Sequence, residues 1–257
     1  MRFASLGSGS GGNATLISCG DTRLLIDCGF GVRETERRLA RLKVPAESLS
    51  AILVTHEHSD HIKGVGAFAR KHGTPVYMTP GTYVSRDYGR IPELHLIENY
   101  RPFGVGGIHV QPVAVPHDAR EPAQYIVNGN GRRLGVLTDL GSITPHVVEA
   151  YNGCDSLLVE ANHDPMMLAA GPYPPSLKAR VASPWGHLSN QQTAGLLRQL
   201  EIGRLQHLVV GHISRKNNSL NCAAEALQSV FAGIVDAGAN RVHYACQDEG
   251  FGWLDIN

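Results

Sequence analysis

Paired cysteines are missing from this sequence. Its five cysteines are odd in number, lie far apart and include no CxxC pair. This pattern excludes a disulfide framework and a zinc site made of thiolates, and it is typical of a protein in a reducing cytosol. The positions are Cys19, Cys28, Cys154, Cys222 and Cys246.

Long apolar runs and an excess of charge are missing as well. No stretch reaches the roughly 18–20 apolar residues that span a bilayer, and the opening MRFASLGSGSGG has no apolar core of a signal peptide. The formal net charge is zero, which argues against a surface that coats long nucleic acids but allows a local basic patch. We therefore expect a cytoplasmic protein with no membrane partner.

The chain has enough apolar material for a large core. Its 257 residues are 42% hydrophobic and 18% charged, and we expect one domain over residues 1–257. Short Val-, Ile- and Leu-rich runs predict strands, and patterns with helical spacing lie between some of them. This mixture predicts an α/β (α+β) fold with two sheets and helices outside them. The expected strands are 2–6, 14–18, 23–27, 51–55, 75–78, 108–115, 123–127, 133–138, 156–160, 207–210 and 241–244, and the expected helices are 32–42, 62–72, 190–200 and 223–237.

Two segments interrupt this pattern. GSGSGGN at residues 7–13 precedes a strand rather than a helix, so it predicts a tight turn close to the functional pocket and not a phosphate-binding loop. Residues 171–184 are rich in proline, with Pro165 just before them, and predict a long irregular connection. Such a connection is either functional or a plain surface loop.

The densest chemical signal is ILVTHEHSDHIKG at residues 52–64, where an HxHxDH pattern follows an apolar run. Imidazole and carboxylate groups are ligands that suit zinc, manganese or iron. In an extended loop His56 and His58 face the same way and can bind one ion, while Asp60 and His61 turn toward a second position. The alternative is a solvated histidine-rich loop, which the position after a buried strand disfavours.

Further ligand-type residues directly follow other predicted strands. Loops at the carboxyl ends of strands share one edge in sheet-based enzymes, so we expect these residues to converge. One aspartate after a strand is usually a turn or cap residue, but five cases beside HxHxDH carry more weight. They are Asp27 in TRLLIDCG, His117 in VQPVAVPHDA, Asp139 in RLGVLTDLG, Glu160 in SLLVEANHD and His212 in LQHLVVGHIS.

In this order the residues resemble the five motifs of the metallo-β-lactamase superfamily, over nearly the whole chain. The resemblance implies the four-layer αβ/βα sandwich of the metallo-β-lactamase fold, with two divalent ions between the sheets. Zinc or manganese is expected there, with iron as a third candidate. The resemblance implies that His56, His58 and His117 hold metal one, that Asp60, His61 and His212 hold metal two, that Asp139 bridges both, and that Asp27 orients the HxHxDH loop.

Several longer strings resemble the YycJ/WalJ-like branch, which is related to the nuclease side of the superfamily. They are FASLGSGSGGNATLI, PHDAREP, VEANHD, GHLSNQQTA and GHISRKNN. Glu160 and His187 also resemble the proton-relay pair of tRNA 3′-processing relatives. The alternative for His187 is a plain position before a helix capped by Ser189. The interval from Asp139 to His212 is too short for a β-CASP insertion, and no tRNA-binding arm is evident, so tRNA processing is not expected.

The resemblance implies a phosphodiesterase or nuclease that acts on DNA ends by attack of a metal-activated hydroxide. Asp139 would orient the hydroxide, and His187, held by Glu160, would protonate the leaving alkoxide. Cations and amides near the site would hold substrate phosphates. The predicted substrate contacts are His163, Arg215, Lys216 and Asn217, whereas Lys178 and Arg180 are interpreted as ordinary surface charge.

Two other functions are left open. A thioester or lactone hydrolase of the glyoxalase II/lactonase type would use the same metals. A non-catalytic metal-binding regulator would not need so complete a ligand set with a proton relay. Only substrate-contacting residues can distinguish the nuclease from the thioester or lactone hydrolase. Here Glu160–His187 and Arg215–Lys216 favour a phosphoryl substrate. A homodimer is compatible with the sequence, and neither the metal nor the polarity of a nuclease follows from it.

Overall fold

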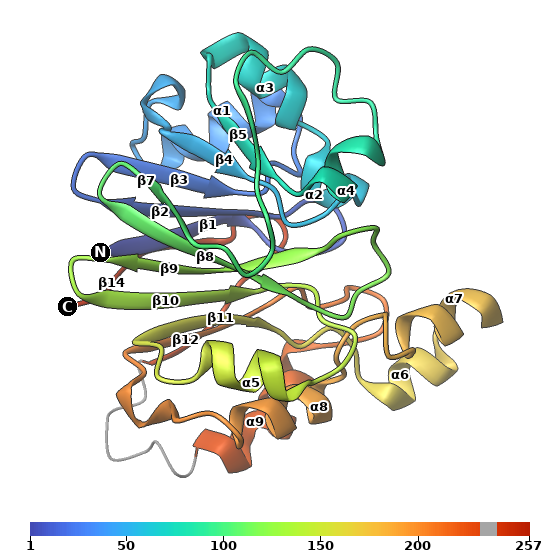
Figure 1. Cartoon of the computed structure of the whole chain (residues 1–257). Helices are drawn as coiled ribbons and strands as arrows, with labels where there is room; N and C mark the ends of the chain where they lie inside the picture. The colour runs from blue at the N-terminus through green and yellow to red at the C-terminus, as the bar shows by residue number, and fades with distance from the viewer. Residues whose placement is uncertain (232–240) are drawn as a thin grey trace.

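Two seven-stranded β-sheets pack face to face in the computed structural model, which describes residues 1–231 and 241–257 (Figure 1). The strand order is β14-β1-β2-β3-β4-β5-β6 in the first sheet and β13-β12-β11-β10-β9-β8-β7 in the second. The first sheet consists of β1 Arg2–Gly7, β2 Ala14–Cys19, β3 Thr22–Ile26, β4 Ala51–Leu53, β5 Val76–Met78, β6 Leu94–Leu96 and β14 Phe251–Asp255. The second consists of β7 Phe103–Val105, β8 Ile108–Ala114, β9 Ala123–Gly129, β10 Arg132–Leu137, β11 Ser156–Glu160, β12 His207–Gly211 and β13 Val242–Tyr244.

Successive apolar side chains along each strand point to opposite faces of the sheet, which explains why both faces are covered. On β11, Leu158 belongs to the core between the sheets, whereas Leu157 and Val159 belong to the outer core. On β3, Leu24 faces inward and Leu25 outward. Successive side chains point to opposite faces of a strand, so each sheet of such strands needs a partner on both sides.

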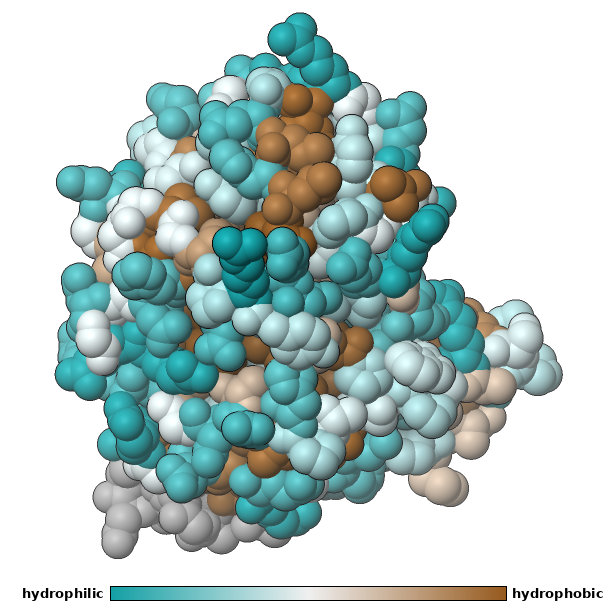
Figure 2. Space-filling view, viewed as in Figure 1, coloured by the Kyte–Doolittle hydropathy of each residue, from teal (hydrophilic) through white to brown (hydrophobic). Residues whose placement is uncertain are grey.

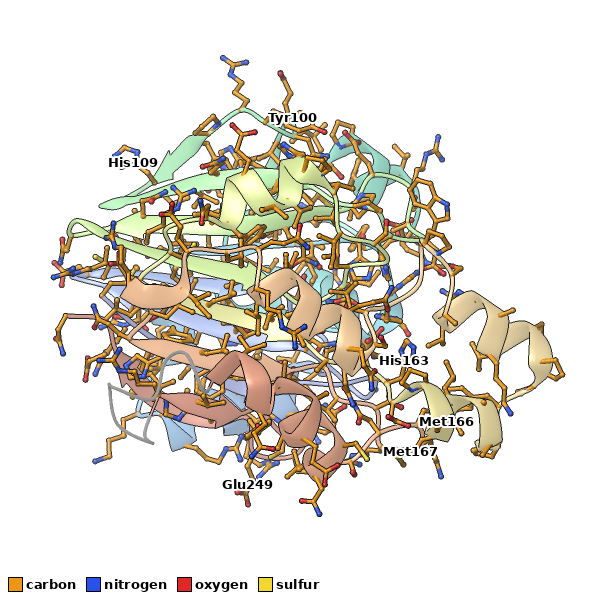
Figure 3. All side chains as sticks on the ribbon, turned by 90° about the horizontal axis from the view of Figure 1, so that it is seen from below. Tyr100, His109, His163, Met166, Met167 and Glu249 are labelled. Carbon is orange, nitrogen blue, oxygen red and sulfur yellow. The ribbon has the colours of Figure 1, made fainter. Side chains whose placement is uncertain are left out.

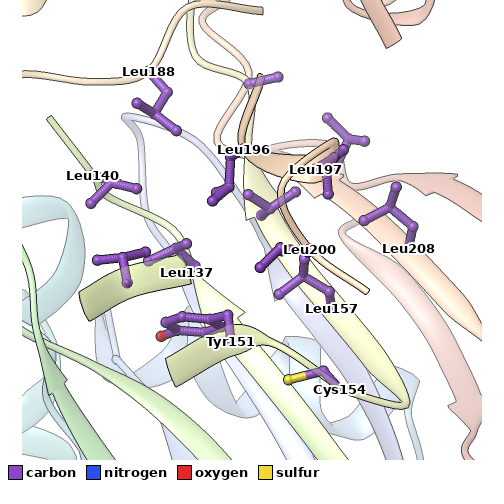
Figure 4. Packing of buried hydrophobic residues seen from close by; sticks show 14 of the residues in the cluster. Leu137, Leu140, Tyr151, Cys154, Leu157, Leu188, Leu196, Leu197, Leu200 and Leu208 are labelled. Carbon is purple, nitrogen blue, oxygen red and sulfur yellow. The ribbon is translucent and has the colours of Figure 1, made fainter. Parts of the chain in front are cut away.

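Helices cover the outer faces and complete the four-layer αβ/βα sandwich that was expected. Leu39 of α1 and Phe68 of α3 pack on the first sheet, and Val147 of α5, Leu196 of α8 and Leu227 of α9 pack on the second. Figure 4 shows part of this second outer core. Among the described helices, none is long and apolar enough to cross a bilayer. The helices are α1 Val32–Arg41, α2 Ser59–Ile62, α3 Val65–His72, α4 Pro80–Val84, α5 Pro145–Tyr151, α6 Pro165–Ala170, α7 Pro175–Val181, α8 Asn190–Leu197 and α9 Leu220–Phe231, with 3-10 turns at Ala46–Ser48 and Ile202–Arg204.

The topology brings six strand ends to one edge of the molecule. β3 and β4 are parallel neighbours in the first sheet, and β10, β11 and β12 are parallel neighbours in the second. β8 runs the same way as β10, because both are antiparallel to β9. The chain termini lie at the opposite edge, on the left of Figure 1. Residues that follow these six strands are therefore placed together.

Two predicted helices differ from the structure. The helix predicted over 62–72 is divided into α2 and α3, and Gly64 lies at the division. A Cβ atom there would be 2.1 Å from the backbone oxygen of Phe30, so only glycine allows the α2–α3 junction to approach the loop after β3. The helix predicted over 223–237 is described only as far as Phe231 in α9, and its remaining residues lie outside the described ones. The strands β6, β7 and β14 and the helices α4 and α5 were not expected from the sequence.

The proline-rich segment is not the irregular connection that was expected. Pro165 opens α6 and Pro175 opens α7. Proline suits the first turn of a helix, because the N–H that it lacks has no partner there. The two helices form an arm, here called the α6–α7 arm (residues 165–181), which stands out from the body beside the shared strand edge (Figure 1).

Candidate metal centre

A pocket of about 430 Å³ opens at the shared strand edge. In Figure 2 the outline of the molecule is indented on this side, between the body and the α6–α7 arm. Both sheets contribute to the pocket, because its lining comes from loops after strands of each sheet. The histidines, carboxylates and arginines that line it are His58, Asp60, Arg86, Asp118, Asp139, Arg180, His187 and His212.

The first ligand cluster contains the three histidines predicted for metal one. Nδ1 of His58 lies 3.0 Å from Nε2 of His56 and 3.3 Å from Nε2 of His117. Nitrogens that share a tetrahedral zinc ion with bonds of about 2.0–2.1 Å lie roughly 3.3–3.4 Å apart. The remaining ring nitrogens contact other groups: Nδ1 of His56 lies 2.9 Å from the Thr55 hydroxyl, and Nδ1 of His117 lies 3.0 Å from the Gly186 carbonyl oxygen. Such contacts fix the orientation of ligand rings.

The second cluster contains the residues predicted for metal two. Oδ2 of Asp60 lies 3.4 Å from Nε2 of His61 and 3.6 Å from Nε2 of His212. Nδ1 of His61 lies 2.8 Å from Oδ2 of Asp27, which is buried. Asp27 Oδ1 also accepts a 2.8 Å hydrogen bond from the backbone N–H of Thr55. Asp27 therefore connects the His61 ring to the start of the HxHxDH loop, as the resemblance implies.

Asp139 lies between the two clusters. Its Oδ2 is 3.3 Å from Nε2 of His61, and its Oδ1 is 3.8 Å from Nε2 of His117 and 3.3 Å from Nδ1 of His212. Asp139 Oδ2 and His212 Nδ1 are buried without a hydrogen-bond partner among the described residues. Buried polar atoms are nearly always satisfied, and a cation between the clusters would satisfy both of these. The donor set therefore fits divalent ions.

The charges of this centre favour bound positive charge, as protons or as a cation. Burial lowers the pKa of His56 well below its usual range, and His61 adds to the effect, so the His56 ring is neutral as metal binding requires. Burial acts the same way on His61 and His212, but Asp139 and other carboxylates outweigh it and raise the pKa of both rings. The carboxylates thus hold protons on two histidines, and divalent ions would supply that positive charge instead.

Two site residues have left-handed backbone conformations that residues other than glycine rarely adopt. Asp27 has a φ of 62° and His212 a φ of 50°. Each costs on the order of 1–3 kcal/mol and persists only where the surroundings determine it. Asp27 is held by Thr55, and the backbone N–H of His212 donates a 2.8 Å hydrogen bond to Oγ of Ser8. Strain of this kind is typical of functional sites.

Glu160 and His187 form a pair beside the ligand clusters. Oε2 of Glu160 lies 3.0 Å from Nδ1 of His187, and Oε1 accepts backbone N–H bonds from Leu140 and Leu188 at 2.6 and 3.2 Å. Burial alone would raise the pKa of Glu160, but His187 outweighs it and lowers that pKa. The contact at Nδ1 leaves Nε2 of His187 for the pocket. Ser189 caps α8 through a capping box, so the expected helix start after His187 is confirmed. His187 therefore precedes a capped helix and also contacts Glu160.

The predicted substrate contacts lie outside the pocket lining of the described chain. Arg215 forms an exposed ion pair with Asp248, Lys216 is exposed, and Asn217 is buried. His163 is buried at the base of the α6–α7 arm, where Figure 3 labels it near Met166 and Met167 of α6. The substrate-binding roles of these four residues stay predictions.

Several lining residues were missed. Arg180, interpreted from sequence as surface charge, lines the pocket and forms an ion pair with Asp118. Oδ1 of Asp118 is 3.5 Å from Nε2 of both His58 and His117. Asp118 could have been inferred from its place next to His117, but no pattern around Arg180 signals its position. Arg86 and Tyr173 also line the pocket and had no such signal.

The predicted turn at residues 7–13 does approach the site. The backbone N–H of Asn13 donates a 2.7 Å hydrogen bond to the backbone oxygen of Asp60. Its side-chain amide donates to Oδ2 of Asp60 at 3.1 Å. The prediction of a tight turn close to the pocket is confirmed.

Comparisons with known proteins agree with this geometry. The model of the beta-lactamase superfamily domain matches residues 22–213. The chain is 34% identical over 236 residues to the exodeoxyribonuclease YycJ of Bacillus anthracis, covering 90% of this chain and 89% of that protein. It is 34% identical over 224 residues to the exodeoxyribonuclease WalJ of Streptococcus pneumoniae, covering 85% and 83%. In fold it is similar to the metallo-beta-lactamase fold protein YhfI from Bacillus subtilis, with a TM-score of 0.75, 16% identity and 99% of both chains covered.

Proposed function

The chain belongs to the metallo-β-lactamase superfamily, and from this premise we propose that it is a two-metal hydrolase that removes nucleotides from DNA ends. Two relatives that are 34% identical over most of its length are named exodeoxyribonucleases. The observation that carries the proposal is the pair of ligand clusters joined by Asp139, with the Glu160–His187 pair beside them. A structural metal site would not need a second cluster or a paired histidine at the pocket.

We assign His56, His58 and His117 to metal one and Asp60, His61 and His212 to metal two, with Asp139 shared. Divalent ions in such a site lower the pKa of bound water and neutralise charge on a phosphoryl oxygen. Zinc or manganese suits imidazole and carboxylate ligands. Five unpaired cysteines are compatible with the reducing cytoplasm, where we place the protein.

The chain itself supplies orientation and a proton. Asp139, whose Oδ1 lies near His117 of the first cluster and His212 of the second, orients the attacking oxygen. His187, held through Nδ1 by Glu160, presents Nε2 to the pocket and gives a proton to the leaving alkoxide. Glu160 is fixed by two backbone N–H groups, so it keeps the His187 ring in one orientation.

The deciding experiment offers end-labelled single- and double-stranded DNA to zinc- or manganese-loaded protein, beside a lactone and a glutathione thioester. We expect labelled DNA to shorten from its ends. Rapid lactone or thioester turnover with intact DNA would reject the nuclease proposal and leave a hydrolase that uses the same metals. Elemental analysis of the loaded protein tests the expected two ions per chain.

A further inference from the structure

A second groove beside the metal centre has the charge of a nucleic-acid site. Its volume is about 580 Å³, and it shares Ser59 and Arg86 with the lining of the metal pocket, so the two adjoin each other. Its other charged lining residues are Lys63, Arg70 and Asp87. Three cations thus face one carboxylate, in a protein whose formal net charge is zero.

The floor of the groove is α2, the helix that also carries metal ligands. Ser59, Ile62 and Lys63 have i, i+3, i+4 spacing, which places them on one face of the helix, and all three line the groove. Asp60 and His61 lie between them in sequence and belong to the second ligand cluster. A DNA strand whose end lies at the metal ligands can therefore continue over Ser59 into the groove.

Two of the cations have no protein partner. Lys63 and Arg86 are exposed, and neither side chain forms a hydrogen bond or ion pair with another residue in the described part of the chain. Exposed arginines outside the groove either pair with a carboxylate, as Arg37 does with Glu34 and Arg215 with Asp248, or, like Arg33, line neither pocket. Unpaired cations that share a groove repel each other, and an anion bound between them removes that repulsion.

The wall that carries Arg86 is held in place before any ligand binds. Nη1 of Arg70 donates to the carbonyl oxygens of Tyr88 and Arg90 at 2.8 and 3.0 Å. The backbone of Gly66 approaches this loop so closely that a Cβ there would lie 1.9 Å from the oxygen of Tyr88. A groove ordered in advance loses less conformational entropy on binding.

We propose that this groove, through Lys63, Arg70 and Arg86, binds the backbone phosphates of the single DNA strand whose end lies at the metals. This inference rests on the proposed function and names where its substrate lies. Among the described residues that line the groove, only Tyr88 has an aromatic ring, and it is buried, so the groove contacts phosphates and not bases. Binding is therefore independent of base sequence and depends strongly on salt.

The first test measures binding without cleavage. Metal-free protein is titrated against a fluorescein-labelled twelve-nucleotide oligo-dT, and Kd from fluorescence anisotropy is followed from low to high salt. Each lost phosphate contact lowers the log–log salt slope by about 0.7 for a single strand. Lys63→Gln with Arg86→Gln should therefore weaken binding and lower the slope by about 1.4. The matched control is Arg33→Gln with Lys43→Gln, which removes the same charge from exposed positions that line neither pocket.

The second test measures turnover against strand length. With metal-loaded wild-type and control protein, kcat/KM for an eight-nucleotide strand should exceed that for a two-nucleotide strand, because only the longer strand fills the groove. In Lys63→Gln with Arg86→Gln this ratio should fall toward one. If DNA is cleaved but neither test separates the two double variants, the groove inference is overturned while the nuclease function stands. If DNA is not cleaved but anisotropy separates them, the function is overturned and the groove stands.

Discussion

Asp27 connects three groups at the base of the second ligand cluster. It contacts Nδ1 of His61 and both the backbone N–H and the hydroxyl of Thr55. Its side chain is buried and its backbone is left-handed. A carboxylate behind a metal-binding histidine fixes the ring and raises its basicity, and losing such a contact typically costs 10–100-fold in metal affinity.

We therefore predict that Asp27→Asn lowers the affinity for one of the two ions by roughly 10–100-fold and leaves the other almost unchanged. The amide keeps the shape of the side chain but removes its charge. Calorimetric titration with zinc measures both sites, and Asp21→Asn, at an exposed turn without a described partner, is the control. Equal weakening of both sites, or of neither, would contradict the role assigned to Asp27.

His187 is the residue whose two interpretations can be separated by experiment. We predict that His187→Ala lowers turnover of DNA by roughly 10²–10⁴-fold, as loss of a positioned general acid does. The loss should be much smaller for bis-p-nitrophenyl phosphate, because p-nitrophenolate leaves without a proton. Metal content should stay the same.

Ser189→Ala is the control for that prediction, because it removes the cap of α8 and not the proposed acid. It should cost about 1 kcal/mol of stability without changing the dependence on the leaving group. An equal loss on both substrates in His187→Ala would show that the histidine has no role as an acid.

Most of the site could be predicted from the sequence, because its residues come from strand ends that share one edge. The structure brings together the seven ligand-type residues with Glu160 and His187. The cations could not be predicted in the same way. Arg215 is three residues from His212, but a short separation along the chain does not fix direction, and its side chain pairs with Asp248 instead. Arg180 reaches the pocket from an arm that the sequence did not indicate.

At the scale of elements, short continuous apolar runs predict the strands of the two sheets well, because a strand that is covered on both faces is apolar at successive positions. β6 and β7 have three residues each, with His95 or Gly104 at the centre, so neither shows an apolar run. Prolines at 165 and 175 suggested a loop but open helices, because the residues after them have no further break. Close backbone contacts are also invisible in the sequence, although they decide where glycine is required.

Gly29 is such a position, and it couples the loop after β3 to α2. A Cβ there would lie 1.8 Å from the backbone oxygen of Asp60. We predict that Gly29→Ala displaces Asp60, weakens binding of one ion and costs about 3 kcal/mol or more of unfolding free energy. Gly31→Ala is the matched control, since a Cβ there meets nothing within 4 Å, and it should stay within about 0.5 kcal/mol of wild type. Denaturant unfolding and metal titration measure both, and similar values for the two variants would contradict the prediction.

At the scale of the whole molecule, the metal centre connects the two sheets. Asp27 and the HxHxDH loop come from the first sheet, whereas His117, Asp139 and His212 come from the second. Ions bound by both sheets stabilise the packed pair over the separated sheets, because binding only the native state favours it by mass action. We infer that residues 1–257 unfold as one unit, so removal of metal should lower the midpoint of a single transition and not split it.

The metal-free protein should also lose stability as the pH rises, and the metal-loaded protein should not. Without ions, Asp139 and neighbouring carboxylates raise the pKa of His61 and His212 above the usual 6.5, although burial opposes this. Above about pH 6.5 the unfolded chain releases these protons while the native state keeps them. The stability that they confer is therefore complete below that pH and is lost as the pH rises through the raised pKa values.

Bound ions replace the protons and bind better as the ligands deprotonate. Melting temperatures measured between about pH 6.5 and 9, with zinc or with a chelator, should therefore diverge. Asp60→Asn removes one of the carboxylates and should reduce the loss in the metal-free protein, whereas a metal-free midpoint that is flat or rises over this range would show that the buried carboxylates do not hold these protons.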